Sequence, residues 1–234
     1  MNILSNLFTS SLGRKYIMAF SGAALFLFVI GHLLGNLQVF LGPNQINAYG
    51  HFLQTTPEIL WPARAGLLIM VALHIWSAVT LSAENKTARP VPYAAWNPTV
   101  ASYAARTMLM SGLIIAAFVV YHLLHFTVQA RSINFTGQDF VALRDARGRH
   151  DVFRMMITGF SFPLVSGFYV LAIGLLCLHL SHGASAMFQS MGWKNEVYGP
   201  LIDRSARVAA WMIFLGYSSI PVAVLLGYGK EALK

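Results

Sequence analysis

Charged residues are scarce in this sequence. Only 10% of its 234 residues are Asp, Glu, Lys or Arg, whereas 56% are hydrophobic. Ordinary soluble domains carry about 25% charged residues. Because ionised side chains are costly on a surface that faces lipid, this deficit argues against a soluble enzyme. It indicates instead that much of the protein surface lies in a membrane.

Cysteine is nearly absent as well. Cys177 is the only cysteine and stands inside an apolar run, which is typical of a small core residue. A single cysteine excludes an internal disulfide, a zinc site built from cysteine pairs and an iron–sulfur cluster held by this chain alone. The glycine-rich fingerprint of dinucleotide binding is also missing.

Long apolar stretches are what the sequence does contain. A bilayer-spanning helix needs about 20 apolar residues, and none of the stretches shows the ten-residue alternation of a membrane barrel. We therefore predict an all-α integral membrane protein, a bundle of five transmembrane helices forming one domain over residues 1–234. The predicted spans are about residues 16–40, 62–82, 103–129, 160–182 and 208–228.

The polar segments between these spans set the expected topology. Gly42-Pro43-Asn44 ends the first span, and residues 131–154, the longest polar segment, are expected to form a solvated or interfacial helix. Arg14-Lys15 before the first span favours a cytoplasmic N-terminus in an inner (cytoplasmic) membrane, although the 16 basic residues taken together divide evenly between the two sides. The formal net charge of +8 is scattered, so we expect contacts with lipid or protein partners and none with nucleic acid.

Six of the eight histidines lie within the predicted spans. Ionisable side chains inside a membrane are costly and are functional by default. A lone histidine is often only a hydrogen bond between helices, but here four helices each supply at least one and the fifth supplies none. The six are His32, His74, His122, His125, His179 and His182.

The depth of these histidines predicts two pairs. Successive helices run in opposite directions, so His32 and His122 lie toward the outer side, whereas His74 and His179 lie toward the inner side. At 1.5 Å per residue, each pair is displaced by roughly 8 Å from the midplane. Two imidazoles from facing helices can bind a haem iron from both sides. A zinc site is disfavoured because no four ligands share one depth.

Spacing alone leaves the third and fourth ligands open. His122 and His125 are three residues apart, as are His179 and His182, so both members of each pair lie on neighbouring helix faces.

Several short motifs occur in a fixed order along the five spans. Taken together they resemble the single-polypeptide, two-haem cytochrome b subunit of succinate dehydrogenases and menaquinol:fumarate reductases. The resemblance covers nearly the whole chain. It rests on Gly31-His32-Leu33, Leu73-His74, His122-Leu123-Leu124-His125-Phe126, Asp151-Val152-Phe153-Arg154-Met155, and His179-Leu180-Ser181-His182-Gly183 through Gly192-Trp193.

The resemblance implies which histidines hold haem iron. The family's fourth ligand is followed by glycine four residues later, which matches His179, and its third follows an aromatic residue, which matches His122 after Tyr121. It thus implies an outer haem b between His32 and His122 and an inner haem b between His74 and His179. His125 and His182 are expected nearby, bonding propionates or quinone. The order Gly192-Trp193 is reversed relative to the family, and Cys177 stands where some members carry a proton-conducting glutamate.

The resemblance also implies partners and a role. A flavoprotein subunit interconverts succinate and fumarate on the cytoplasmic side, and an iron–sulfur subunit passes electrons between it and the inner haem. Electrons cross to a quinone, expected to be menaquinone, and the complex can form a higher oligomer. The N-terminal segment, residues 83–102 and residues 183–205 are expected to dock the iron–sulfur subunit. The rival expectation for Lys86, Arg89, Lys194 and Arg204 is contact with lipid head groups alone.

A quinone site is expected near the outer haem. The segment between the first two spans supplies His51, Gln54, Glu58 and Arg64, and quinone chemistry needs proton exchange. Glu58 is the candidate for that exchange, against the simpler interpretation of a solvated loop carboxylate. Two further functions stay open: a di-haem cytochrome b of another respiratory complex, and a transporter with a histidine relay. The transporter predicts acidic partners inside the spans, and the sequence has none.

Overall fold

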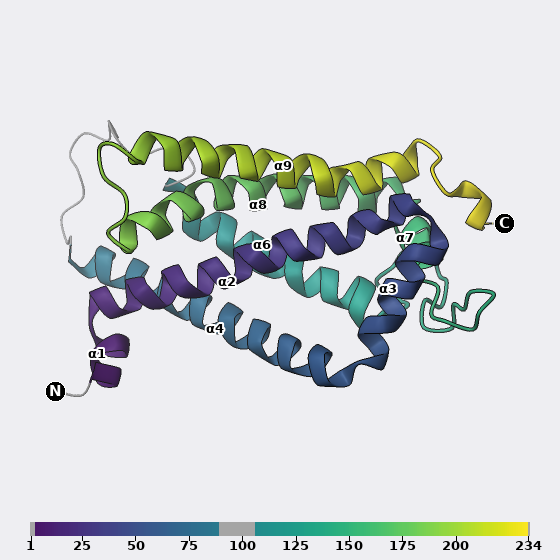
Figure 1. The fold of residues 1–234 in the computed structure, drawn as a ribbon, viewed down its shortest axis with the longest axis horizontal. Coiled ribbons are helices and arrows are strands. Elements are labelled where there is room, and N and C mark those ends of the chain that lie inside the picture. Colours follow the sequence, from purple (N-terminus) through teal and green to yellow (C-terminus); the bar gives the residue numbers. More distant parts are fainter. Residues whose placement is uncertain (1–2, 89–105, 234) are drawn as a thin grey trace. The chain divides into compact units, whose positions relative to one another are not determined.

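The computed structural model describes residues 3–88 and 106–233, which are helical apart from their connections. The described residues form no β-strand, only one isolated bridge between Arg144 and His150. Figure 1 labels the α-helices along the chain, and the described residues also form three short turns that the figure does not label. They are α1 (Ile3–Thr9), α2 (Ser11–Leu37), the 3₁₀ turn η1 (Gln38–Leu41), α3 (Pro43–Thr55), α4 (Pro57–Thr87), α6 (Met108–His122), the π-helical turn η2 (Leu123–Thr127), α7 (Val152–Phe160), α8 (Pro163–Ser190), α9 (Gly199–Leu225) and the 3₁₀ turn η3 (Lys230–Leu233).

Five helical segments of the described chain are long and apolar enough to cross a membrane. They cover Ser11–Leu41, Pro57–Thr87, Met108–Thr127, Pro163–Ser190 and Gly199–Leu225. For the described residues, the all-α class and five helices long and apolar enough to cross a membrane are therefore confirmed, and the chain has the character of a multi-pass membrane protein. The start predicted for the third span, at residue 103, lies outside the described residues.

Most of these helices extend beyond the predicted apolar runs. The second begins at Pro57 instead of residue 62, and the fifth begins at Gly199 instead of residue 208. The fourth instead begins at Pro163, because Phe160 belongs to α7. Hydrophobicity marks only the part of a helix that faces apolar surroundings, whereas backbone hydrogen bonding continues into polar residues at its ends.

Two predictions about the connecting segments are wrong. Residues between the first two spans form α3 instead of a simple loop. Residues 128–151 form turns instead of an interfacial helix, and only α7 follows them. Side chains in this segment bind its own backbone N–H groups: Asn134 accepts from Gly137, and Asp139 accepts from Val141. Such local bonds compete with helix formation.

The chain forms two compact units, and the long helices contribute to both. Unit 1 comprises the described parts of Met1–Phe28, Arg64–Leu113 and Leu178–Ala210, and unit 2 comprises those of Val29–Ala63, Ile114–Cys177 and Trp211–Lys234. Of the six span histidines, unit 1 holds His74, His179 and His182, and unit 2 holds His32, His122 and His125.

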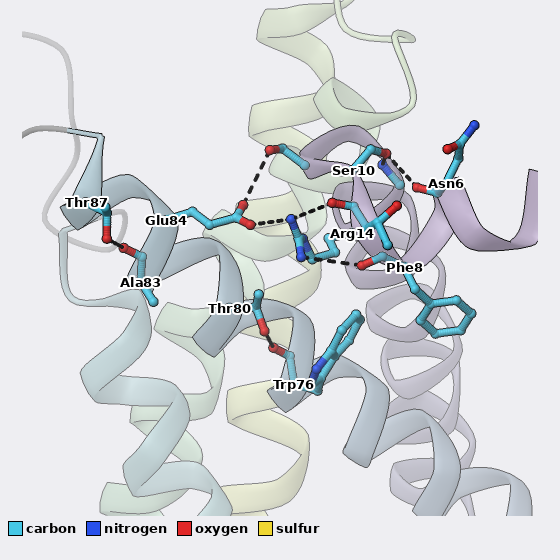
Figure 2. Close-up of polar contacts among 12 residues, drawn as sticks. Asn6, Phe8, Ser10, Arg14, Trp76, Thr80, Ala83, Glu84 and Thr87 are labelled. Atoms are coloured by element: carbon cyan, nitrogen blue, oxygen red, sulfur yellow. Dashed lines mark hydrogen bonds and ion pairs between the residues drawn. The ribbon is translucent and has the colours of Figure 1, made fainter. Parts of the chain in front are cut away.

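In unit 1, Arg14 ties three helices together. Its guanidinium pairs with Glu84 of α4 and donates to the carbonyl oxygen of Thr9 at 2.9 Å and to that of Phe8 at 3.4 Å. Figure 2 shows this side chain between the carboxylate and the end of α1. Because Arg14 itself belongs to α2, one cation holds α1 against α2 and α4.

In unit 2, Asn47 of α3 holds the polar segment before α7. Its side chain is 1% exposed, and its amide donates to the carboxylates of Asp145 at 3.3 Å and Asp151 at 3.0 Å. Its Oδ1 accepts from the Phe153 backbone N–H. Partial desolvation acts to raise the pKa of the Asp145 carboxyl, but hydrogen bonds from Arg149, the Arg147 backbone and Asn47 outweigh it and lower that pKa to about 2.

Candidate functional site

In unit 1, His74 of α4 and His179 of α8 face each other. Their ring centroids are 6.3 Å apart and their planes are inclined by 67°. The two residues come from different helices, so their approach is a property of the tertiary structure. The arrangement brings two imidazoles from two different helices close together within the unit.

Each of these rings contacts a serine from a further helix. His74 Nδ1 lies 3.3 Å from the Oγ of Ser21 on α2, and His179 Nδ1 lies 3.2 Å from the Oγ of Ser111 on α6. Both serines are buried. Their neighbours Gly22 and Gly112 lie beside the same rings: a Cβ on Gly22 would be 3.2 Å from Cε1 of His74, and one on Gly112 would be 3.4 Å from Cε1 of His179.

In unit 2, His32 of α2 and His122 of α6 form the second pair. Their ring centroids are 5.8 Å apart and their planes are inclined by 82°. Aromatic rings surround the pair: Tyr217 lies 6.2 Å from His32, and Phe118 lies 6.1 Å from His122, centroid to centroid. The surroundings are apolar, as a large hydrophobic cofactor requires.

His125 lies close to this second pair but does not face His32 in the same way. It sits in the π-helical turn η2, is fully buried, and stacks on Phe126 with ring centroids 4.0 Å apart. Its Nδ1 lies 3.0 Å from the Tyr169 hydroxyl, and its Nε2 has no hydrogen-bond partner among the described residues. A Cβ on Gly159 would be 3.1 Å from that Nε2, so little room remains there for a ligand atom.

Each pair offers two imidazoles, which are common ligands of transition metals and of haem iron. No group of three or more His, Cys, Asp or Glu that could hold a metal ion occurs within residues 3–88 and 106–233. A metal–imidazole bond is about 2.0–2.1 Å long and the ring centroid lies roughly 1.1 Å beyond the nitrogen, so two axial imidazoles have centroids about 6.2–6.4 Å apart. The separation of His74 and His179, 6.3 Å, falls in this range, and that of His32 and His122, 5.8 Å, is slightly shorter.

The other residues predicted to bind quinone, support a haem or dock a partner do not belong to either histidine pair. Glu58 lies exposed in the first turn of α4, and His51 lies exposed on α3. Both belong to unit 2. His182 is half-buried on α8 in unit 1. Of the predicted docking segments, residues 3–10, 83–88 and 183–205 lie in unit 1, whereas residues 89–102 lie outside the described residues.

Three polar side chains that lie near the histidines were not predicted from the sequence: Ser21, Ser111 and Tyr169. A signal for the two serines does exist in the sequence. Each is followed by glycine and stands eleven residues before a span histidine, Ser21 before His32 and Ser111 before His122. Tyr169 carries no comparable signal, because only the packing of α8 against η2 brings its hydroxyl to His125.

Comparison with protein-family models, with curated proteins and with solved structures finds no match to this chain.

Proposed function

We propose that this chain is the membrane-anchoring cytochrome b subunit of a succinate:quinone oxidoreductase. In this proposal it holds two haem b groups and carries electrons between an iron–sulfur subunit and a membrane quinone. The observation that supports it is the presence of two facing histidine pairs, each joining two different membrane helices. A structural histidine in a membrane needs only one hydrogen-bond partner, whereas a haem held by two histidines needs a pair of imidazoles close together on different helices.

The four histidines of the pairs are the proposed iron ligands. His74 and His179 hold the haem on the side predicted to be cytoplasmic, and His32 and His122 hold the haem on the other side. When bound, such a haem supplies one-electron chemistry, its iron alternating between two oxidation states. The chain keeps the imidazoles opposed, surrounds them with apolar side chains and, through Ser21 and Ser111, gives two of them a fixed polar neighbour.

Unit 1 is the proposed docking side for the iron–sulfur subunit, which in turn binds the flavoprotein. The segment after α8 exposes large apolar side chains: Trp193 is 61% exposed, Val197 78% and Tyr198 57%. Lys194 pairs with Asp203 of α9 at 2.7 Å and holds this segment in place. A fixed, exposed apolar surface in the unit that holds the His74–His179 pair is what a protein partner would cover.

Unit 2 is the proposed quinone side, with menaquinone as the expected substrate. Glu58 is exposed at the start of α4, so its carboxylate is available to exchange protons with solvent. The far-side haem pair belongs to the same unit. In the proposal, electrons leave the chain here, and Glu58 supplies or accepts the protons that quinone chemistry requires.

The test is to purify the protein from a membrane in which it is expressed with its neighbours. Two b-type haems per chain, measured by the reduced-minus-oxidised spectrum and by haem extraction, are expected, together with co-purifying flavoprotein and iron–sulfur subunits. Two haems with different partner subunits would favour another respiratory complex. A preparation without haem in a folded, membrane-inserted chain would disprove the proposal.

A further inference from the structure

The first and third membrane helices share a repeated motif. On α2, Ser21-Gly22 precedes His32-Leu33-Leu34, and on α6, Ser111-Gly112 precedes His122-Leu123-Leu124 at the same interval of eleven residues from serine to histidine. Phe28 and Phe118 occupy the same place in each copy. Eleven residues are close to three turns of an α-helix, so in each copy the serine and the histidine lie on one face of their helix.

The two copies have the same relation to the ligands of unit 1. Ser21 contacts the ring of His74 on α4, and Ser111 contacts the ring of His179 on α8. In each case the helix contacts the histidine of the next membrane helix along the chain. The two serines therefore act on the two opposed imidazoles of a single pair, one serine for each ring.

The hydroxyl protons of both serines are already engaged. Ser21 Oγ donates to the carbonyl oxygen of Ile17 at 2.7 Å, and Ser111 Oγ donates to that of Met108 at 3.1 Å. A hydroxyl carries one proton but two lone pairs. Each Oγ therefore has a lone pair that can accept a hydrogen bond from the imidazole nitrogen beside it.

We propose that Ser21 and Ser111 are positioning residues that hold His74 and His179 with a proton on Nδ1 and a lone pair on Nε2. This inference rests on the proposed function, in which Nε2 of each ring binds haem iron. A ligating histidine usually donates its other ring N–H to a fixed acceptor, which sets the tautomer and the ring orientation and makes the ligand more basic. Here the acceptors are two serine hydroxyls, beside the backbone carbonyl oxygens of Met18 and Met108, which also bond to these rings.

The glycines of the motif complete the arrangement. A Cβ on Gly22 would be 3.2 Å from Cε1 of His74, tighter than ordinary contact, and one on Gly112 would be 3.4 Å from Cε1 of His179. Gly31 lies on the same helix as Gly22, yet a Cβ there would meet nothing within 4 Å. The Ser-Gly step thus provides an acceptor and the space for the ring that uses it.

The proposal predicts the sign of a change in haem potential. Loss of the acceptor makes the imidazole less basic, so it stabilises ferric iron less, and the midpoint potential of the haem held by His74 and His179 should rise. The other haem should keep its potential, because neither serine contacts His32 or His122. A serine with a purely structural role would shift neither potential.

The experiment compares Ser21→Ala and Ser111→Ala with Ser77→Ala in the purified complex. Ser77 is a buried serine on α4 that donates only to carbonyl oxygens of its own helix, those of Leu73 and His74. The readouts are haem content, redox titration of the optical bands and the low-temperature EPR signals of the ferric haems. We expect both haems to be retained, one potential to rise in Ser21→Ala and Ser111→Ala, and neither to move in Ser77→Ala.

Two further variants and one control keep the proposal testable if an alanine variant assembles poorly. Ser21→Thr retains the acceptor oxygen and should keep the original potential, and Gly22→Ala should alter the EPR signal of the same haem while Gly31→Ala should not. Unchanged potentials in Ser21→Ala and Ser111→Ala, with wild-type haem content, would overturn the role of the serines and leave the proposed function intact. A wild-type protein without haem would overturn both.

Discussion

The hydroxyl of Tyr169 lies 3.0 Å from Nδ1 of His125, and the same hydroxyl lies 3.5 Å from Nδ1 of His122. One hydroxyl proton can serve only one of the two nitrogens. If His122 donates from Nδ1 and Tyr169 donates to His125, Nε2 of His122 keeps its lone pair. This arrangement leaves His122 able to bind a metal and gives His125 a supporting position, in agreement with the proposed ligand assignment.

Replacing single histidines should remove the haems one at a time. Each variant should lose the haem of its own pair and retain the other haem, because each pair lies within a different unit. The haem lost is the inner one in His74→Ala and His179→Ala. It is the outer one in His32→Ala and His122→Ala. Haem extraction and the optical spectrum measure the loss. His125→Ala and His182→Ala should shift a spectrum without abolishing a haem. Loss of haem in His125→Ala but not in His122→Ala would reverse the assignment on the third span.

Removing the Tyr169 hydroxyl should affect only the haem of His32 and His122. Tyr169→Phe keeps the ring, which packs on Phe118 and Phe160 with centroids 5.1 and 5.0 Å away, so folding should be little changed. The potential of that haem should rise, because His122 loses its nearest acceptor. Phe118→Leu is a control that alters packing but removes no hydrogen bond. Equal shifts in both variants would assign the effect to packing alone.

Asn47 should be important for the stability of unit 2. Asn47→Ala leaves the Phe153 N–H and two carboxylates without this partner in a buried place, and loss of such a partner costs about 1–3 kcal/mol. Thermal unfolding in detergent and the rate of proteolysis in the polar segment before α7 measure the change in stability. Gln45→Ala on the same helix, which removes only an exposed bond to Gln38, is the control and should change stability little.

The segment before α7 should loosen as the pH falls below about 6.5. Desolvation, with the nearby Arg144, lowers the pKa of His150 below its usual value of 6.5, despite the opposing effects of the Leu143 carbonyl and Asp151. Its neutral ring accepts from the Gln129 amide, with 3.1 Å between the two nitrogens. The unfolded segment therefore takes up a proton first as the pH falls, and the folded form loses stability.

Hydrogen exchange of residues 128–151 between pH 7.5 and 5.5, corrected for the intrinsic pH dependence of exchange, measures this effect. His150→Gln should remove the dependence because a glutamine does not titrate. The same loosening in His150→Gln would show that another group is responsible.

Glu58 should be needed for quinone turnover but not for electron entry. Glu58→Gln should retain both haems and lower quinone-linked activity, while activity with an artificial acceptor that bypasses the membrane stays constant. Because Glu58 is exposed, this substitution should not affect folding. Unchanged quinone-linked activity would remove Glu58 from the mechanism. Gln45→Ala, also exposed but on α3 of the same unit, is the control for a polar change outside the expected quinone site.

Secondary structure could be predicted from the sequence where a whole segment has apolar surroundings. In lipid every backbone polar group must be bonded within its own segment, so apolar runs such as that around Phe28 can only be helical. The structure of the connecting segments could not be predicted in this way. Residues 128–151 are polar enough for an interfacial helix, yet Asn134, Asp139 and Asp145 bond to the backbone and hold turns instead. That choice depends on competing bonds of similar strength, which composition does not reveal.

The sequence by itself determined a five-helix membrane chain, and its alternating spans predicted which histidines share a side of the membrane. That much follows from the low charge, the helix length a bilayer demands and the cost of burying an ionisable group. Only the tertiary structure decided that His125 bonds Tyr169 instead of facing His32, and that Ser21 and Ser111 meet His74 and His179. Those contacts depend on helix rotation and on a π-helical turn, which arise from packing between segments distant in the chain. The repeated Ser-Gly motif marks the two serines in the sequence, but it does not tell which histidines they meet.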